Sequence, residues 1–207
     1  FDNYYEFYQR ELNSEDNDDQ PENISLISFQ ISNVCSQIKK GLLRNERVIV
    51  FLQLLEFVHE DQLVTDQELE FIKTVARVFN LSDSEFNNFK SFIFDGNPDL
   101  LESDKVLVID NQIREWSDSL AWVMKKKISS DHGYRYLYRK NLYGKFVVFY
   151  IQSIKSFIFR YFGELNLYIE GQKIISGRPY YFKKGSIIKG PNIESIYYHD
   201  IASKFTS

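Results

Sequence analysis

Cysteine is almost absent from this sequence, which excludes two classes of small domain. The 207 residues include one cysteine, Cys35, so no disulfide can form within the chain. The histidines, His59, His132 and His199, lie far apart, and no cysteine or histidine partner stands at zinc-ligand spacing. The composition therefore predicts neither a disulfide scaffold nor a zinc domain. One cysteine fits a reducing compartment, and we expect Cys35 to be a small apolar core residue.

Long apolar runs and catalytic motifs are also missing. The longest unbroken apolar run, FVVFYI at residues 146–151, is far shorter than the roughly 20 residues of a membrane-spanning helix. We therefore expect no segment of this chain to cross a bilayer. The motifs G-x-S-x-G, H-E-x-x-H, C-x-x-C and the phosphate loop G-x-x-x-x-G-K-[ST] do not occur. We expect no catalytic or cofactor-binding residue in this chain.

Charge is present but unevenly distributed. Residues 1–25 hold eight acids and one base, whereas residues 125–190 hold fourteen Lys or Arg and three acids. The basic stretch also holds fifteen Tyr or Phe, and RNA-binding sheets stack bases on aromatics in such surroundings. Because β-sheets are rich in buried aromatic residues in any case, we expect this stretch chiefly to form an ordinary sheet or a surface that contacts another subunit. An anionic membrane surface ranks next, and nucleic acid is the least expected partner.

Helix-start signals organise residues 44–95. Thr65 with Glu68, and Ser82 with Glu85, form capping boxes, in which each side chain bonds the backbone of the other residue. Apolar residues at helical spacing follow both boxes. These signals predict two helices separated by a short capped turn.

Two further helices precede these. Asn45 is the expected N-cap of the nearer one, and Gly41 ends the helix before it. The apolar stripe of that earlier helix consists of Ile27, Phe29, Ile31, Val34, Ile38 and Leu42. Four amphipathic helices with short connections predict an antiparallel bundle over residues 24–100. Residues 1–23 are predicted to be an acidic linker or the end of a preceding helix.

The pattern changes at the turn sequence Gly-Asn-Pro, residues 96–98. KVLVI at residues 105–109 is a predicted strand, residues 114–128 fit either a helix or a strand, and short β-rich runs separated by glycines follow Gly133. KFVVFYI is apolar on both faces, which predicts a central strand. We expect residues 101–207 to form a module of short antiparallel strands that leads into a further domain. The fold class is α+β with segregated helical and strand-rich parts.

The turn near residue 61 is the one candidate metal site. Its acidic residues are Glu56, Glu60, Asp61, Asp66, Glu68 and Glu70. Asp61 ends one predicted helix and Glu68 lies in the first turn of the next, so folding can bring them close. Hard cations such as Ca²⁺ or Mg²⁺ bind oxygen clusters of this kind, although the spacing is not that of an EF-hand. The alternative is that Glu68 serves only as a capping residue and the other acids form a solvated face.

Residues 47–94 resemble the TerB-like helical family of tellurite-resistance proteins. The family pattern is an apolar helix ending in Asp, a short turn with Ser or Thr, and a Glu seven residues after the Asp. Asp61, Thr65 and Glu68 occupy these positions. The resemblance implies a TerB-like bundle with a divalent-cation site at Asp61 and Glu68.

A second resemblance is to the N-terminal extension of bacterial ABC-transporter ATP-binding proteins. Residues 160–205 carry it in the runs RYFGELNLYIEGQKI, RPYYFKKGSII and SIYYHDIASKF. It implies that ATP binds only in a downstream ATPase domain, and that the partners are this domain and the transporter's membrane subunits. It also implies a cytoplasmic chain that is peripheral to the inner membrane. The expected function is therefore a non-catalytic regulatory or scaffolding region that acts by protein docking. The alternatives are a stand-alone TerB-like metal-binding stress-response protein and a nucleic-acid-binding module that uses residues 125–190.

Overall fold

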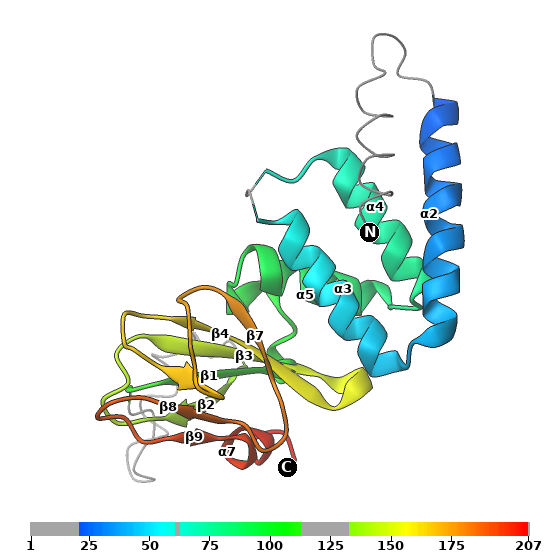
Figure 1. The fold of residues 1–207 in the computed structure, drawn as a ribbon. Helices are drawn as coiled ribbons and strands as arrows, with labels where there is room; N and C mark the ends of the chain where they lie inside the picture. Colours follow the sequence, from blue (N-terminus) through cyan, green and yellow to red (C-terminus); the bar gives the residue numbers. More distant parts are fainter. Residues whose placement is uncertain (1–20, 61–62, 113–132, 207) are drawn as a thin grey trace.

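The computed structural model describes residues 21–60, 63–112 and 133–206 of the chain. Helices gather at one end of the molecule and strands at the other (Figure 1), which confirms the α+β class. The helices are α2 (Pro21–Gly41), α3 (Arg44–Val58), α4 (Asp66–Val78) and α5 (Asp83–Phe94). Short 3-10 turns follow at η1 (Pro98–Leu100) and η2 (Ser103–Lys105). None of the helices in these ranges is both long and apolar enough to cross a membrane.

Capping residues fix the starts of α4 and α5 as the sequence predicts. Thr65 Oγ1 accepts the Glu68 backbone N–H at 3.2 Å, and Glu68 Oε2 accepts the Thr65 N–H at 2.8 Å. Ser82 and Glu85 repeat this arrangement at 3.2 and 2.9 Å. Both predicted capping boxes are therefore confirmed.

The start of α3 and the faces of α2 differ from the predictions. Leu43, not Asn45, is the N-cap of α3, because the Glu46 carboxylate accepts the Leu43 N–H at 2.7 Å and closes the first turn. Helix α2 ends at Gly41, as expected, but it begins at Pro21, inside the predicted linker; proline suits the first turn of a helix. Cys35 is buried, whereas three members of the predicted stripe are exposed. They are Phe29, Val34 and Ile38.

The first sheet has five strands in the order β2-β1-β3-β4-β7. The strands are β1 (Val106–Asp110), β2 (Arg135–Tyr138), β3 (Lys145–Ile151), β4 (Ser156–Phe162) and β7 (Pro179–Phe182). Strand β3 is central, as predicted, and pairs antiparallel with β1 and β4. Strand β1 pairs with β2 in parallel, which differs from the antiparallel pairing expected. Parallel neighbours need a long connection, and residues 111–134 supply it.

The second sheet has four antiparallel strands in the order β6-β5-β8-β9. Its strands are β5 (Tyr168–Ile169), β6 (Gln172–Lys173), β8 (Ile187–Lys189) and β9 (Ile196–Tyr197). The β5–β6 turn places Glu170 at φ 50° and Gly171 at φ 81°, the left-handed values of a tight hairpin. The other elements within the described ranges are η3 (Gln152–Ile154), between β3 and β4, and α7 (Tyr198–Ala202), after β9.

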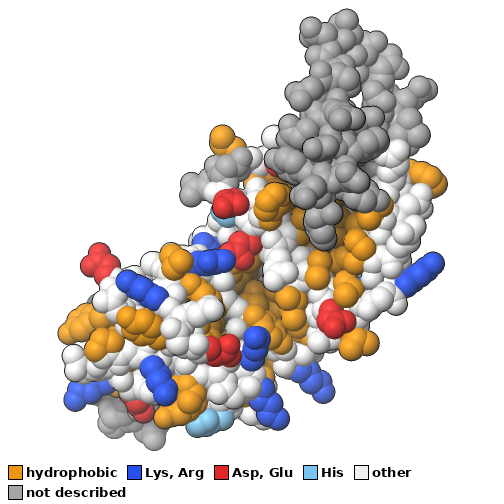
Figure 2. All heavy atoms as spheres, in the orientation of Figure 1, with side chains coloured by type: hydrophobic (Ala, Val, Ile, Leu, Met, Phe, Trp, Pro, Cys, Tyr) orange, Lys and Arg blue, Asp and Glu red, His pale blue; other side chains and the backbone are white. Residues whose placement is uncertain are grey.

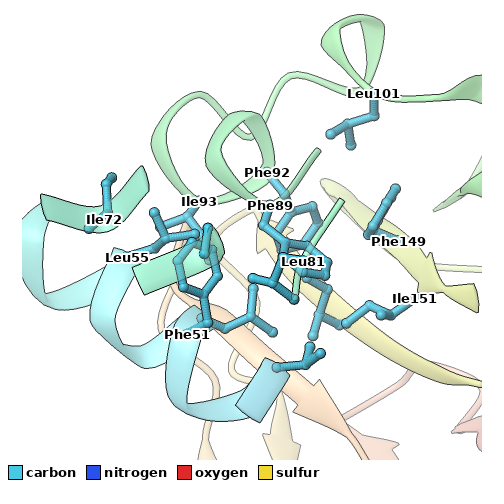
Figure 3. Close-up of a cluster of buried hydrophobic side chains, with 14 of the residues drawn as sticks. Phe51, Leu55, Ile72, Leu81, Phe89, Phe92, Ile93, Leu101, Phe149 and Ile151 are labelled. Atoms are coloured by element: carbon cyan, nitrogen blue, oxygen red, sulfur yellow. The ribbon is translucent and has the colours of Figure 1, made fainter. Parts of the chain in front are cut away.

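The first sheet is a middle layer with a core on each face. Val147 and Phe149 of β3 pack with the helices, and Figure 3 shows Phe149 beside Phe89 and Phe92 of α5. Phe146 and Val148, which alternate with them, pack with the second sheet and α7. Side chains of a strand point alternately to opposite faces, so an apolar run without alternation fits a strand covered on both sides.

Candidate functional site

The predicted metal site is only partly within the described residues. Asp61 lies outside them, while Glu68 is held in the capping box, where its Oε2 also accepts the Thr65 hydroxyl at 2.8 Å. In the ranges that the structure describes, no three His, Cys, Asp or Glu side chains gather as metal ligands. His59, near this turn, stacks on Phe94 with ring centroids 4.6 Å apart. A cation at Asp61 and Glu68 stays a prediction, and the observed role of Glu68 is to cap α4.

A cavity of about 330 Å³ lies between the start of α5 and the end of β3. Its lining residues are Ser82, Ser84, Glu85, Asn88, Phe89, Lys105, Phe149, Tyr150, Ile151, Gln152 and Ser153. The Glu85 carboxylate on its wall receives two hydrogen bonds from Arg44 Nη2, both at 2.7 Å. Burial raises the pKa of Glu85, but hydrogen bonds from Ser153, the Ser82 backbone and Arg44 outweigh it and lower the pKa. This carboxylate therefore joins the starts of α3 and α5.

A second closed network lies beside this cavity. The Glu102 carboxylate accepts hydrogen bonds from the Ser84 hydroxyl and from Asn88 Nδ2, the latter at 2.7 Å. Lys105 Nζ lies 2.5 Å from Glu102 Oε2. Asn88 Oδ1 in turn accepts the Glu102 backbone N–H at 3.0 Å. Because these groups satisfy one another, the cavity wall serves chiefly to tie α5 to the chain before β1.

This network predicts a pH dependence of stability. The bond from Lys105, followed by that from Ser84, lowers the pKa of Glu102 from 4.5 to about 2. A carboxylate with a depressed pKa stabilises the fold above its unfolded pKa, and this contribution is lost as the pH falls from about 4.5 to about 2. We expect Glu102→Gln to lower the free energy of unfolding at pH 6 and to flatten its decline in that acid range. Urea denaturation as a function of pH measures both effects.

The size of this effect is limited by exposure. The Glu102 side chain is 40% exposed, so solvent screens the ion pair and the loss is well below the full value of the pKa shift. Glu70→Gln is the matched control, because Glu70 forms an exposed pair with Lys73 one helical turn away at 3.7 Å. If the free energy of unfolding of Glu102→Gln fell as steeply with decreasing pH as that of the wild type, the role given to Glu102 would be contradicted.

Helix α3 is apolar on two sides, although only one side packs against the core. Val48, Phe51 and Leu55 are fully buried. Leu43, just before α3, and Val50 and Phe57 within it are 68%, 38% and 70% exposed. These exposed residues, here called the α3 stripe, are spaced by seven and lie on one line along the helix. Figure 2 shows hydrophobic side chains gathered on the viewed face of the helical part.

Sequence reasoning missed the α3 stripe, although the signal was in the sequence. A helix of a globular protein is normally polar on its outer side, whereas a helix that is apolar all round is normally buried. Nine of the twelve residues from 47 to 58 are apolar. These apolar residues cannot all be core residues, because one face of α3 must point away from the core. The exposed apolar face of α3 is the feature most in need of a partner.

The aromatic side chains of the basic region are mostly buried or half-buried. Phe146, Phe159, Tyr161 and Phe182 are fully buried in the core between the two sheets. The large aromatic side chains exposed between residues 133 and 190 are Tyr138, Tyr143 and Tyr168. Most of the aromatic pattern therefore serves packing within the sheets.

The segment IYYHDI, which carries part of the ABC-transporter resemblance, closes the second sheet. Asp200 Oδ2 accepts the Tyr197 N–H at 3.0 Å and lies 2.5 Å from Nη2 of the buried Arg139. Ile196 and Ile201 are fully buried. The segment thus anchors α7 to the end of the first sheet, which is a structural role.

Comparison with known proteins gives no match to a protein-family model, to a curated protein or to a solved structure. The TerB-like and ABC-transporter resemblances therefore stay hypotheses that rest on the residues quoted for them.

Proposed function

We propose that this chain is a non-catalytic accessory region of an ABC-transporter ATP-binding protein and acts by docking. The α3 stripe carries the proposal. Leu43, Val50 and Phe57 repeat at seven-residue intervals, the spacing with which one helix packs along another. Burying such side chains removes apolar surface from water, which is the main driving force for association. The stripe is narrow, so its natural occupant is a single helix.

The charges beside the stripe define that partner further. Glu46, one helical turn before Val50, and Glu60, just after the end of α3, are both exposed. Glu56 forms an exposed ion pair with Arg178 of the strand-rich part. A partner helix with an apolar seam and basic flanks complements this surface in both shape and charge. The resemblance of residues 160–205 to ABC-transporter extensions supports the ATPase domain as the source of that helix, with the membrane subunits as further partners.

Acidic substitutions within the stripe test the docking. Val50→Glu combined with Phe57→Glu should weaken binding to the separately purified ATPase domain at least about 100-fold. Burying each apolar side chain contributes about 1.5 to 3 kcal/mol, and each 1.4 kcal/mol is worth about tenfold in affinity. Isothermal titration calorimetry measures the affinity. The melting temperature of the chain should change little, because both side chains are exposed.

Ile175→Glu is the matched control. Ile175 is 55% exposed and lies in the strand-rich part, so its substitution should leave the affinity unchanged. Equal losses in the control and in the double variant would show a general charge effect and reject the α3 stripe. The gene beyond the codon for Ser207 gives an independent test. A G-x-x-x-x-G-K-[ST] loop there supports the transporter assignment, and a nearby stop codon removes it.

The second candidate is a stand-alone TerB-like protein that binds a divalent metal. The cap geometry of Thr65 and Glu68 is compatible with it, since Glu68 Oε1 is not engaged in the capping box. Calcium or magnesium titration separates the two functions. Binding that is lost in Asp61→Asn would favour the metal protein.

A further inference from the structure

The outer face of the second sheet brings together cations that are separated in sequence. Tyr168 of β5 lies opposite Lys173 of β6 on one side and Lys189 of β8 on the other. The alternate residues Ile169 and Ile188 are buried, so the row Lys173–Tyr168–Lys189 faces outward. Tyr168 is 42% exposed, and both lysines are exposed.

Two more lysines border this row. Lys183 and Lys184 are exposed in the turn before β8. The Ser186 hydroxyl donates to Glu170 at 2.7 Å, which holds this turn beside the β5–β6 turn. None of the four lysines forms an ion pair with another residue of the described ranges. Their charges are therefore available to a partner.

We propose that this lysine face, made of Lys173, Lys183, Lys184 and Lys189 around Tyr168, binds the surface of an anionic membrane. A cluster of four to eight basic residues is the usual size of such a site, and each contributes several-fold to the partition onto anionic lipid. Tyrosine favours the headgroup region, where its ring meets apolar chains and its hydroxyl meets water. Lysine stems lie along apolar surface while the ammonium groups reach the phosphates. The inference goes beyond the proposed function and uses a different surface from the α3 stripe.

Single-stranded nucleic acid fits the same face less well. Such binders present several free aromatic rings along a charged groove, one for each stacked base. The outward row of this sheet holds one tyrosine. The next exposed aromatic on the sheet, Tyr197, is stacked on His199 with ring centroids 5.3 Å apart. The face therefore presents more lysines than unstacked aromatic rings. This composition favours the phosphates of a membrane surface over the bases of a single-stranded nucleic acid.

Vesicle co-sedimentation tests the proposal. The wild-type chain should bind phosphatidylcholine vesicles that contain phosphatidylglycerol, and it should not bind pure phosphatidylcholine. Binding should decrease with added salt, because the attraction is screened within a Debye length. Lys173→Gln with Lys189→Gln should lower the partition coefficient about 30-fold, as expected for two basic residues.

Lys40→Gln with Lys73→Gln is the control, because it removes the same charge from exposed positions of α2 and α4. This variant should keep wild-type partitioning, and thermal melting should show that both double variants are folded. Absence of wild-type binding at low salt, or equal losses in the two variants, would overturn the proposal. So would tighter binding of a single-stranded oligonucleotide that the Lys173/Lys189 variant loses. Both variants retain the α3 stripe, so docking to the ATPase domain is tested independently.

Discussion

Replacing Phe149 by alanine should lower the free energy of unfolding by about 4 kcal/mol, as is typical of a fully buried phenylalanine. Phe149 is 2% exposed and stands on the face of β3 that meets the helices. Its ring lies 6.4 Å from that of Phe89 and 6.1 Å from that of Phe92. The substitution removes packing contacts between α5 and β3 and leaves a cavity between the helices and the first sheet. Urea denaturation followed by far-ultraviolet circular dichroism measures the loss.

Phe57→Ala is the control for this experiment. It deletes the same side chain from a position that is 70% exposed, so the isolated chain should lose no more than about 0.5 kcal/mol. The melting temperature of Phe149→Ala should fall by about 12 °C, since a chain of this size loses about 3 °C for each kcal/mol. Similar stabilities of the two variants would show that Phe149 does not join the two parts.

Arg160→Ala should cost about 3 kcal/mol, because a single guanidinium bonds three backbone carbonyls. Nη1 donates to the carbonyls of Phe92 and Ile93, at 2.7 and 2.9 Å, in the last turn of α5. Nε donates to the carbonyl of Gly177 at 2.5 Å. The last carbonyls of a helix lack partners within the helix and form its negative end. The half-buried Arg160 guanidinium supplies both hydrogen-bond donors and positive charge there. Gly96, at φ 62°, leaves room for the guanidinium, since a Cβ there would lie 2.6 Å from Nη1.

Arg178→Ala provides the comparison for Arg160→Ala. Arg178 pairs with Glu56 at 3.0 Å, but the two side chains are 55% and 37% exposed. An exposed pair of this kind contributes at most about 1 kcal/mol. Burial lowers the pKa of Arg160, yet an arginine starts so high that its charge persists. Amide hydrogen exchange should accelerate at the end of α5 in Arg160→Ala and not in Arg178→Ala. Equal protection in both variants would reject the role given to Arg160.

The capping boxes and the long apolar run were the most reliable signals in the sequence, whereas Asn45 was a wrong N-cap. Thr65 and Ser82 cap their helices because a hydroxyl and a carboxylate three residues later satisfy the first free N–H groups, whatever the rest of the fold does. Strand β3 was readable as central because only a strand covered on both faces tolerates an unbroken apolar run. These features depend on residues within a few positions of each other. The α+β class follows from them.

Features that depend on distant neighbours could not be read in the same way. Ile31 and Phe29 look equivalent in the sequence, yet Ile31 packs on the core and Phe29 is 65% exposed, because α2 packs chiefly against α4. The lysine face depends on a strand register that places Lys173 and Lys189 on either side of Tyr168. The sequence does not distinguish Arg160 from the other basic residues, because its partners on α5 are about 70 residues away in the chain. The type of a side chain predicts which contacts it can form. The packing of distant elements decides which of these contacts form.

The shared core between the helices and β3 has a consequence for synthesis. Phe89 and Phe92 leave the ribosome about 60 residues before Phe149, an interval of roughly 3 to 12 s at ordinary elongation rates. During this time Phe89 and Phe92 lack Phe149 as a packing partner. We expect the nascent chain to need holding chaperones until β3 emerges, and slower translation of residues 96–149 to prolong that need.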